Sequence, residues 1–436
     1  MQDYRGHFVS GADTETVAQY EAALKSFQTF FGDAIGQLDQ CLERSPGFVM
    51  GHVLRAIAYY LTSERRFSIP ARDSLESAGT CPANEREAMH VAAVSHLLQG
   101  RWFDACRAFD EVLVTYPHDI LALQAAHLTD FFLGDAVNLR NRPARVLPVW
   151  DAGMPGASYV KGMYAFGLEE CNQYALAERY GCEALAADPR DPWSVHAVVH
   201  VYEMQGRCAE GVTFMHTREA DWSPDNGFAY HNWWHCALLH LELGDLDGAL
   251  RIADDHVLTD ANESIVLLDM TALLWRLTLA GASVGNRWQG VADRWAARVD
   301  SEQGFYAFND FHAALAFAGA GRMDMLEALG TALSHPDILD VPQDNLPMLT
   351  GVGAPLVQGT LAFARGDHRE AAALFNATRD QASRFGGSHA QRDIINLTLL
   401  ASARRGGDDA LLAHLLRERT MAKPSGRLGE LVAAAA

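Results

Sequence analysis

Apolar residues recur along the chain with the spacing of amphipathic helices, and short turns that contain glycine separate the apolar runs. An apolar helix, a turn with Gly and Arg or Asp, and a second helix with small residues form one pattern. This pattern occurs over residues 97–113, 203–215, 241–253, 318–330 and 364–375. Each turn glycine suits the left-handed conformation that ends one helix before the next begins. These glycines are Gly100, Gly206, Gly244, Gly321 and Gly366.

The spacing of the turns predicts a stack of helix pairs. Gly206 and Gly244 are 38 residues apart (244 − 206), close to the period of about 34 residues that tetratricopeptide units have. No stretch alternates apolar and polar residues as a strand would. We therefore predict an all-α fold, a tetratricopeptide-like α-solenoid in which helix pairs form a right-handed superhelix.

The same pattern predicts where the solenoid begins and ends. Helices are expected at about residues 14–29, 34–44 and 48–63, so the amino-terminal part joins the repeat. One body is expected over residues 1–423, because each unit buries its faces against its neighbours. Residues 424–436 have little to pack against and are expected to fray. Irregular connections are expected at 138–158, which could cap the groove, and at 334–347.

Charge and composition narrow the range of partners. The net charge of −20 comes from 35 Lys and Arg against 55 Asp and Glu, a balance that repels nucleic acid and anionic membrane surfaces. The segment 264–284 is highly apolar but contains Asp269 and Arg276, so no membrane-spanning segment is expected. The seven cysteines are scattered without C-x-x-C spacing. This indicates reduced thiols, and a cytoplasmic protein.

Histidines are concentrated in the middle of the chain, where two H-x-x-x-H pairs occur. His196 and His200 lie four residues apart, and His231 and His235 follow them at a distance of 35 residues. Residues four apart share one face of a helix. The pairs thus occupy equivalent positions of adjacent repeats, and we expect all four imidazoles to face one groove as catalytic groups.

Further polar side chains continue this stripe. Asp269 follows His235 by 34 residues, and the next repeats along the chain carry other ionisable groups at the same phase. Trp234 could form an apolar wall for a small ligand. The predicted substrate-binding groups on these helices are Glu203, Trp234, Asp269, Arg276 and His312.

A second candidate motif is GGSHAQRD, residues 386–393. Ser388 and Gln391 fit a helix-capping box, which would explain the motif structurally. His389, Arg392 and Asp393 lie three and four residues apart, on one helix face, and Arg392 could bind a substrate carboxylate or pair with Asp393. Both interpretations stay open at this stage.

The histidine pairs allow two kinds of chemistry. Beside a carboxylate, neutral imidazole serves as a general acid or base near pH 7. A divalent metal ion is the alternative, with His196, His200, His231, His235 and Glu203 as its ligands. Parallel helices about 8 to 10 Å apart hold such side chains wider than metal bonds near 2 Å require. No nucleotide-binding motif is present, so no nucleotide cofactor is expected.

Several segments together resemble one known family. They are SPGFVMGHVLRAI (45–57), DPWSVHAVVHVYEMQGR (191–207), HNWWHCALLHLELGD (231–245), FNDFHAALAFAGAGR (308–322) and GGSHAQRD (386–393). These are similar to segments of the tetratricopeptide repeat protein 38 family. The resemblance implies a helical-repeat fold and carries no general activity with it.

Two functions follow as hypotheses. The first is a small-molecule enzyme, hydrolase- or lyase-like, which uses the His and carboxylate cluster in a concave groove for hydrolysis, elimination or cyclisation. The second is an adaptor that binds a peptide or partner protein along the groove, the prevailing use of such repeats. Peptide-binding grooves commonly carry spaced Lys, Arg and Asn, whereas these positions carry His, Glu, Asp and Trp. That difference favours the first hypothesis.

Overall fold

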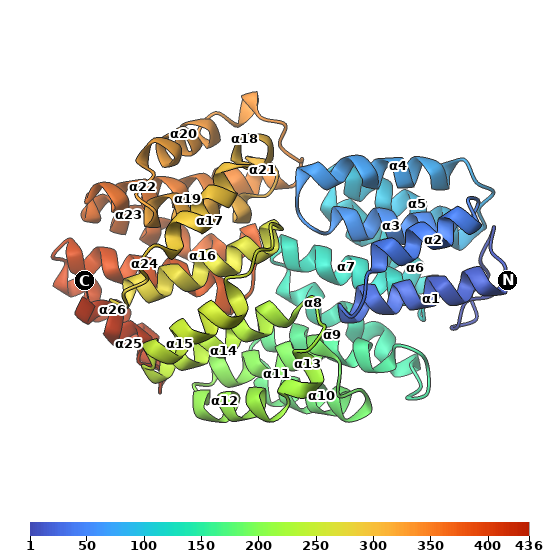
Figure 1. Ribbon diagram of the computed structural model, residues 1–436, viewed down its shortest axis with the longest axis horizontal. Helices are drawn as coiled ribbons and strands as arrows, with labels where there is room; N and C mark the ends of the chain where they lie inside the picture. The colour runs from blue at the N-terminus through green and yellow to red at the C-terminus, as the bar shows by residue number, and fades with distance from the viewer. Residues whose placement is uncertain (436) are drawn as a thin grey trace. The chain divides into compact units, whose positions relative to one another are not determined.

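The computed structural model describes residues 1–435 of the 436-residue chain (Figure 1). All of the regular secondary-structure elements in these residues are helices. They contain no β-strand, only the isolated bridges Gln2–Phe8 and Phe31–Asn226. The prediction of an all-α fold is confirmed.

The chain forms two compact units. Unit 1 comprises residues 1–198 and 220–229, and unit 2 comprises 199–219 and 230–435 among the described residues. The boundary falls inside one helix, α11 (Pro192–Met204). The prediction of a single continuous body over residues 1–423, and of its right-handed superhelix, stays a prediction.

Unit 1 is built from consecutive helix pairs, since α1 packs on α2, α3 on α4, α5 on α6 and α9 on α10. Its elements are α1 (Thr14–Thr29), α2 (Ala34–Arg44), α3 (Val49–Tyr60), η1 (Arg65–Phe67), α4 (Ser68–Gly79), α5 (Glu85–Leu98), α6 (Trp102–Thr115), α7 (Ile120–Leu133), α8 (Ala136–Val146), η2 (Leu147–Val149), α9 (Ala157–Glu170), α10 (Tyr174–Ala187) and most of α13 (Glu219–Trp222).

Unit 2 continues with helices of the same kind, and α22 and α23 form another closely packed pair. Its elements are α12 (Cys208–Thr217), α14 (Ala229–Leu243), α15 (Leu246–Ile252), η3 (Ala253–Val257), α16 (Ser264–Leu279), α17 (Arg287–Ala296), α18 (Val299–Glu302), α19 (Ala307–Gly319), α20 (Met323–Leu333), η4 (Pro336–Ile338), α21 (Asn345–Met348), η5 (Leu349–Gly353), α22 (Ala354–Arg365), α23 (His368–Thr378), η6 (Arg379–Phe385), α24 (His389–Arg405), α25 (Asp409–Ala422) and α26 (Leu428–Ala435).

Turn chemistry explains the pairing of helices. The five predicted turn glycines have φ values between 69° and 85°, in the left-handed region where a side chain is unfavourable. They are Gly100 (71°), Gly206 (69°), Gly244 (80°), Gly321 (69°) and Gly366 (85°). The protein is therefore an all-α, tetratricopeptide-like repeat protein.

Within unit 2 the later repeats return to the earlier ones. Helix α16 packs on α24 although more than 100 residues separate them (Figure 1). The indole Nε1 of Trp275 donates to Oγ1 of Thr398 at 2.9 Å, and Nη2 of Arg276 donates to the carbonyl of Ala390 at 2.7 Å. These bonds bring α24 and its neighbours beside the middle helices of the unit.

One predicted connection proves to be helical. The sequence predicts an irregular segment over 138–158, but α8 runs to Val146 through Pro143. The guanidinium of Arg142 makes two bonds of 2.8 and 3.0 Å with the carboxylate of Asp130. This buried ion pair anchors the helix, and such tertiary contacts outweigh the low helix propensity of proline.

The predicted fraying of residues 424–436 is wrong for residues 428–435. They form α26, in which Leu428 and Val432 are buried. The preceding backbone is also held, because the amide N of Arg427 donates to the carbonyl of Glu242 at 2.9 Å. Packing against the rest of unit 2 therefore orders this segment. Ala436 lies outside the described residues.

One helical stretch, Asn345–Arg365, is long and apolar enough to cross a membrane by length and composition alone. Within this stretch, 61% of the most apolar window is buried inside the structure. A core helix of a soluble protein has this character, so the stretch is weak evidence for a membrane span.

Candidate functional site

Helix α14 lies at the centre of the candidate site and carries the second histidine pair. His231 and His235 are four residues apart, so their imidazoles project from one face of the helix. His235 is fully buried, whereas 9% of the His231 side chain is exposed. The sequence correctly predicted that the two rings point the same way, because Nε2 of one lies 3.3 Å from Nε2 of the other.

Carboxylates extend this pair at both ends. Nδ1 of His231 lies 2.6 Å from Oδ2 of Asp269 on α16, and Nδ1 of His235 lies 3.3 Å from Oε2 of Glu203 on α11. The four side chains therefore form an uninterrupted chain of hydrogen bonds, Asp269–His231–His235–Glu203. We call this set the histidine chain.

Counting protons limits the charge states of the histidine chain. Its three hydrogen bonds need three protons, whereas two neutral imidazoles supply two. Burial raises the pKa of the Asp269 carboxyl and lowers the pKa of His235 well below its usual value. Both shifts favour uncharged groups. The raised pKa of Asp269 assigns the third proton to its carboxyl group.

The other oxygen of Glu203 is bonded to the carboxyl-terminal part of the chain. Oε1 of Glu203 accepts from Nζ of Lys423 at 2.9 Å, and the same Nζ lies 3.4 Å from Oε1 of Glu242. Arg419, one turn earlier, donates to Glu242 at 2.6 Å and to Asp393 at 2.7 Å. Two cations and three carboxylates thus form one buried cluster, which we call the ion cluster.

Mutual attraction keeps the ion cluster charged. Burial alone would lower the pKa of Lys423, but the carboxylates of Glu203 and Asp393 raise it above its usual value. Burial alone would raise the pKa of Asp393, but Arg419 and Lys423 hold it well below its usual value. Opposite charges at such short range outweigh desolvation here, as they do in other well-bonded buried pairs.

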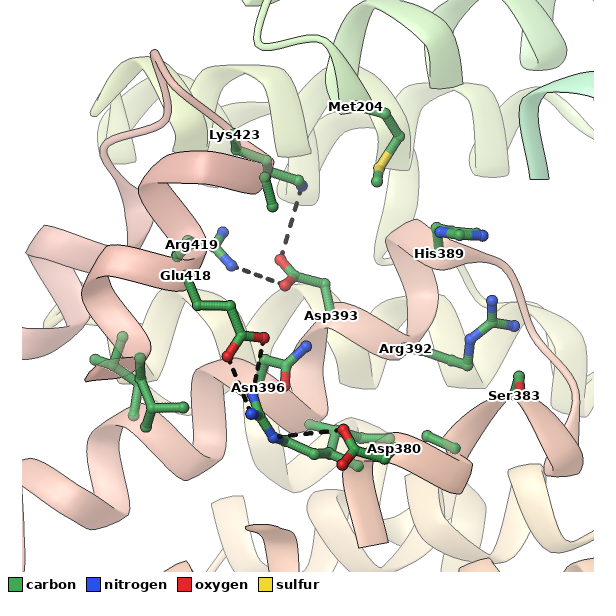
Figure 2. Close-up of a pocket in the computed structure, with 16 residues that line it drawn as sticks. Met204, Asp380, Ser383, His389, Arg392, Asp393, Asn396, Glu418, Arg419 and Lys423 are labelled. Atoms are coloured by element: carbon green, nitrogen blue, oxygen red, sulfur yellow. Dashed lines mark hydrogen bonds and ion pairs between the residues drawn. The ribbon is translucent and has the colours of Figure 1, made fainter. Parts of the chain in front are cut away.

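The ion cluster forms one side of a pocket of about 300 Å³ (Figure 2). His389, Arg392, Asp393 and Asn396 line it from α24, while Arg419 and Lys423 line it from α25 and the residue after it. Figure 2 shows Asp393 paired with both Arg419 and Lys423, with His389 and Arg392 on the other side of the pocket. The pocket therefore offers several hydrogen-bond donors within one small volume.

The structure confirms the capping interpretation of the GGSHAQRD motif, whereas a binding role for its charged residues stays a prediction. Ser388 and Gln391 form the predicted capping box at the start of α24. His389, Arg392 and Asp393 all line the pocket. The guanidinium of Arg392 donates to the carbonyl oxygens of Gly386 and Gly387, which fix it at the pocket's rim.

Two other predicted binding residues are buried among their neighbours. Arg276 is 1% exposed, and its guanidinium carbon lies 5.3 Å from the centre of the Trp234 ring. Trp234 is fully buried and stacks on His231, with ring centres 5.4 Å apart. Arg276 donates to main-chain carbonyls of α16 and α24, and Asp269 pairs with His231. Trp234 thus packs against His231 of the histidine chain, and Arg276 packs against Trp234.

His312 has the contacts of a core histidine. It is fully buried on α19, its Nδ1 lies 2.8 Å from the carbonyl of Phe308, and its ring packs on Phe308 and Phe311. Burial lowers its pKa to about 4. The carbonyl bond and the aromatic neighbours hold the ring in place, and a substrate-binding role for His312 stays a prediction.

The first histidine pair is divided between the units. His200 lies in unit 2, where its ring centre is 4.2 Å from that of His235. His196 belongs to unit 1, where its ring packs on Phe166, Trp193 and Phe228. A cavity shared by all four predicted catalytic histidines stays a prediction, as do their roles.

The distance between the two Nε2 atoms of the histidine chain suits two kinds of bridge. A separation of 3.3 Å fits a shared proton, and it also matches the N···N edge of a tetrahedron with bonds of about 2.0–2.1 Å. The predicted metal set of His196, His200, His231, His235 and Glu203 therefore stays a prediction.

Sequence reasoning missed the residues that complete the site from the carboxyl-terminal end. Glu242, Asn396, Arg419 and Lys423 had no place in the predicted repeat stripe. Arg419 and Lys423 are four residues apart at the end of a helix, which is a signal of a shared face. Because the sequence predicts fraying directly after Lys423, it gives no reason to expect that this face packs against other helices.

Comparisons with known proteins give only distant structural likenesses. No protein-family model matches the sequence. The human IFIT1 dimer with PPP-AAAA is 12% identical, with 97% of this chain and 94% of that chain covered and a TM-score of 0.44. The APC/C hetero-tetramer Cut9-Hcn1 is 10% identical, with 89% and 77% covered and a TM-score of 0.41. A tetratricopeptide repeat protein from Parabacteroides merdae ATCC 43184 is 11% identical, with 72% and 98% covered and a TM-score of 0.33.

Proposed function

We propose that this protein is a non-catalytic interaction protein whose unit 2 pocket binds a carboxylate of a partner peptide. One observation carries the proposal: Arg392 and Asn396 line a pocket of about 300 Å³ whose wall also contains the cations Arg419 and Lys423. Arginine, lysine and asparagine together are the donors that hold a carboxylate, through charge-assisted and often bidentate hydrogen bonds. These are the side chains that the predicted histidine stripe lacked.

The arrangement of charges supports a ligand at the Arg392 side of the pocket. Arg419 and Lys423 already bind Asp393 and Glu242, so their role is to hold the wall in place. Arg392 is held by main-chain carbonyls, and a guanidinium in a partly enclosed pocket interacts strongly with an anion. Asn396, one turn further along α24, offers an amide donor beside it.

The overall negative charge does not exclude an anionic partner. At physiological ionic strength, exposed charges more than about 8 Å apart are largely screened, so the chemistry inside the pocket decides. We further propose that the chain belongs to the tetratricopeptide repeat protein 38 family, which the quoted motifs support, and that it acts in the cytoplasm, as its scattered free cysteines suggest.

The test uses heptapeptides of randomised sequence, each prepared with a free carboxyl terminus and as the carboxyl-terminal amide. Fluorescence anisotropy should identify free-acid peptides that bind at least 10-fold more tightly than their amides. Arg392→Gln should lower that affinity by about 10- to 100-fold, as expected for one charged hydrogen-bonding partner. Arg384→Gln is the matched control, because Arg384 is exposed on the preceding segment and bonds only Gln381 among the pairs described.

Two results would overturn the proposal. One is equal binding of acids and amides across the library. The other is an Arg392→Gln variant that binds as the unaltered protein does while circular dichroism shows that both are folded.

The histidine chain favours a second candidate function, proton-transfer chemistry on a small molecule. A chain of hydrogen bonds that shares one extra proton can move that proton from one end to the other. Here His231 is its partly exposed member. Incubation of the protein with a mixture of small ester, amide and hydroxy-acid substrates would detect turnover by mass spectrometry. Turnover abolished by His235→Gln and retained by Arg392→Gln would favour this candidate over the peptide-binding proposal.

A further inference from the structure

A second face of α14 carries chemistry that neither the histidine chain nor the pocket uses. Trp233, Cys236 and His240 are three and four residues apart and share this face, about a third of a turn from His235. Cys236 is fully buried, and 17% of the His240 side chain is exposed. His216 on α12 packs against the same face, with its ring centre 5.8 Å from that of Trp233.

The three potential ligand atoms converge. A nitrogen of His216, the Sγ of Cys236 and a nitrogen of His240 all lie within 4.8 Å of one another. A tetrahedral site with Zn–N bonds of about 2.0–2.1 Å and a Zn–S bond of about 2.3 Å has ligands roughly 3.3 to 3.7 Å apart. His216 is the partly exposed member of the three, so its side chain has the most freedom to move towards a bound ion.

His240 is oriented as a metal-binding histidine would be. Its Nδ1 lies 2.8 Å from Oδ2 of Asp245, so Nδ1–H donates to the carboxylate and Nε2 keeps its lone pair. Nε2 is buried and has no hydrogen-bond partner among the described residues. A buried acceptor without a partner is costly, and a cation would satisfy it.

Gly248 makes this orientation possible. A Cβ atom at this position would lie 2.1 Å from Oδ2 of Asp245 and 2.7 Å from Nδ1 of His240. Any side chain there would push Asp245 and His240 apart. The glycine, the carboxylate and the imidazole therefore form one supporting arrangement around Nε2.

Aromatic rings cover one side of the three potential ligands, and the His216 side is open to solvent. The ring of His256 stacks on Trp233, with centres 3.9 Å apart and planes 7° apart. His256 belongs to the π-helical segment η3, and such segments occur frequently at functional sites. On the open side, 46% of the His216 side chain is exposed, and its Nδ1 lies 3.6 Å from Oε2 of Glu219.

We propose that His216, Cys236 and His240 bind a divalent transition-metal ion, with Zn²⁺ as the natural occupant and the fourth position taken by Glu219 or water. Two imidazoles and one thiolate suit zinc and cobalt, whereas magnesium and calcium require oxygen ligands. Binding releases the thiol proton of Cys236 to solvent as the sulfur–metal bond forms. The site is independent of the peptide-binding proposal and of the metal set predicted around His231 and His235.

The experiment uses full-length protein purified without a histidine tag, stripped with a chelator and titrated with Zn²⁺ and, separately, Co²⁺. We expect one tight equivalent of Zn²⁺ and a near-ultraviolet sulfur-to-cobalt charge-transfer band. Cys236→Ser should abolish the band, while Cys208→Ser, the matched control at another buried cysteine of unit 2, should retain it. Asp245→Asn should keep the stoichiometry and weaken Zn²⁺ binding about 10- to 100-fold.

A metal held at His231 and His235 would give a cobalt spectrum without the sulfur band, and it would survive Cys236→Ser. That outcome, or the absence of tight Zn²⁺ binding, would overturn the proposal. If Cys236→Ser does not fold, His216→Gln replaces it, because His216 is half exposed and its loss spares the core. Retention of wild-type Zn²⁺ affinity by a folded His216→Gln variant would equally contradict the site.

Discussion

The Nζ of Lys423 lies 2.9 Å from Oε1 of Glu203, although 220 residues separate the two along the chain. This contact joins the end of the last long helix to α11 and connects the ion cluster to the histidine chain. Oε2 of the same Glu203 faces His235. The carboxyl-terminal region thus supplies a cationic partner for the buried Glu203 carboxyl group.

Lys423→Met should therefore destabilise the protein strongly. The change leaves Glu203, Glu242 and Asp393 with one cation fewer in a buried position, and removal of one partner from such a cluster typically costs about 3–5 kcal/mol. The free energy of unfolding from urea titrations measures the loss. Lys161→Met, the same substitution in the exposed pair with Glu183, should cost less than about 1 kcal/mol. Equal effects of the two substitutions would show that the ion cluster contributes no more than a surface pair.

The proton count of the histidine chain predicts a specific pair of tautomers. With the third proton on the Asp269 carboxyl, His231 carries its proton on Nε2 and His235 carries its proton on Nδ1, donating to Glu203. Nitrogen-15 NMR of histidine-labelled protein at pH 7 distinguishes these forms. Asp269→Asn should preserve both tautomers, since the amide can donate to His231 as the protonated carboxyl does. A His235 ring protonated on Nε2 alone would contradict this arrangement.

Because of the buried His312, the protein should lose stability in mild acid. Burial lowers its pKa from 6.5 to about 4, so between these pH values the unfolded chain binds a proton that the folded protein does not. Stability is therefore fully present above about pH 6.5 and falls as the pH drops towards 4, by up to about 3 kcal/mol from this residue.

His312→Gln is the variant that isolates this effect. The glutamine amide can still donate to the carbonyl of Phe308, but it does not titrate. Urea titrations from pH 7 to pH 4 should therefore show a shallower fall in the free energy of unfolding. His335→Gln, at an exposed histidine, should leave the pH dependence unchanged. Parallel curves for the unaltered protein and His312→Gln would show that His312 is not the titrating group.

The local features of this protein could be predicted from its sequence. The first two helices were placed at 14–29 and 34–44, and they span those residues. Phase along the helices correctly predicts that His231 and His235 share a face, and that Asp269 lies within reach of this pair through His231. These successes share one cause: helical periodicity and repeat length fix which residues face the same way.

Features that depend on contacts between distant repeats could not be predicted. The repeat pattern places Arg276 nearly in phase with Asp269, but it gives no sign of the hydrogen bond from Arg276 to the backbone of α24. The pocket depends on Lys423 and Arg419, whose segment carries no repeat signal strong enough to show that it packs. The ligand geometry at His240 depends on Gly248 and Asp245, and a local pattern gives no reason to separate this histidine from an ordinary surface residue.

Close packing of helix pairs yields the last prediction. Gly167 on α9 lies so near α8 that a Cβ atom there would be 2.3 Å from the carbonyl oxygen of Leu139 and 2.4 Å from the amide nitrogen of Arg140. Both are backbone atoms, so only separation of the two helices could relieve the clash. Gly167→Ala should therefore destabilise the protein by roughly 1–3 kcal/mol or more.

Gly290→Ala on α17 is the control, because no atom lies within 4 Å of its Cβ position. This substitution should stabilise the protein by about 0.5–1 kcal/mol, as expected when alanine replaces glycine in an exposed helix. Thermal unfolding of both variants measures the difference, and a stabilising Gly167→Ala would mean that α8 and α9 pack less closely than the backbone distances require.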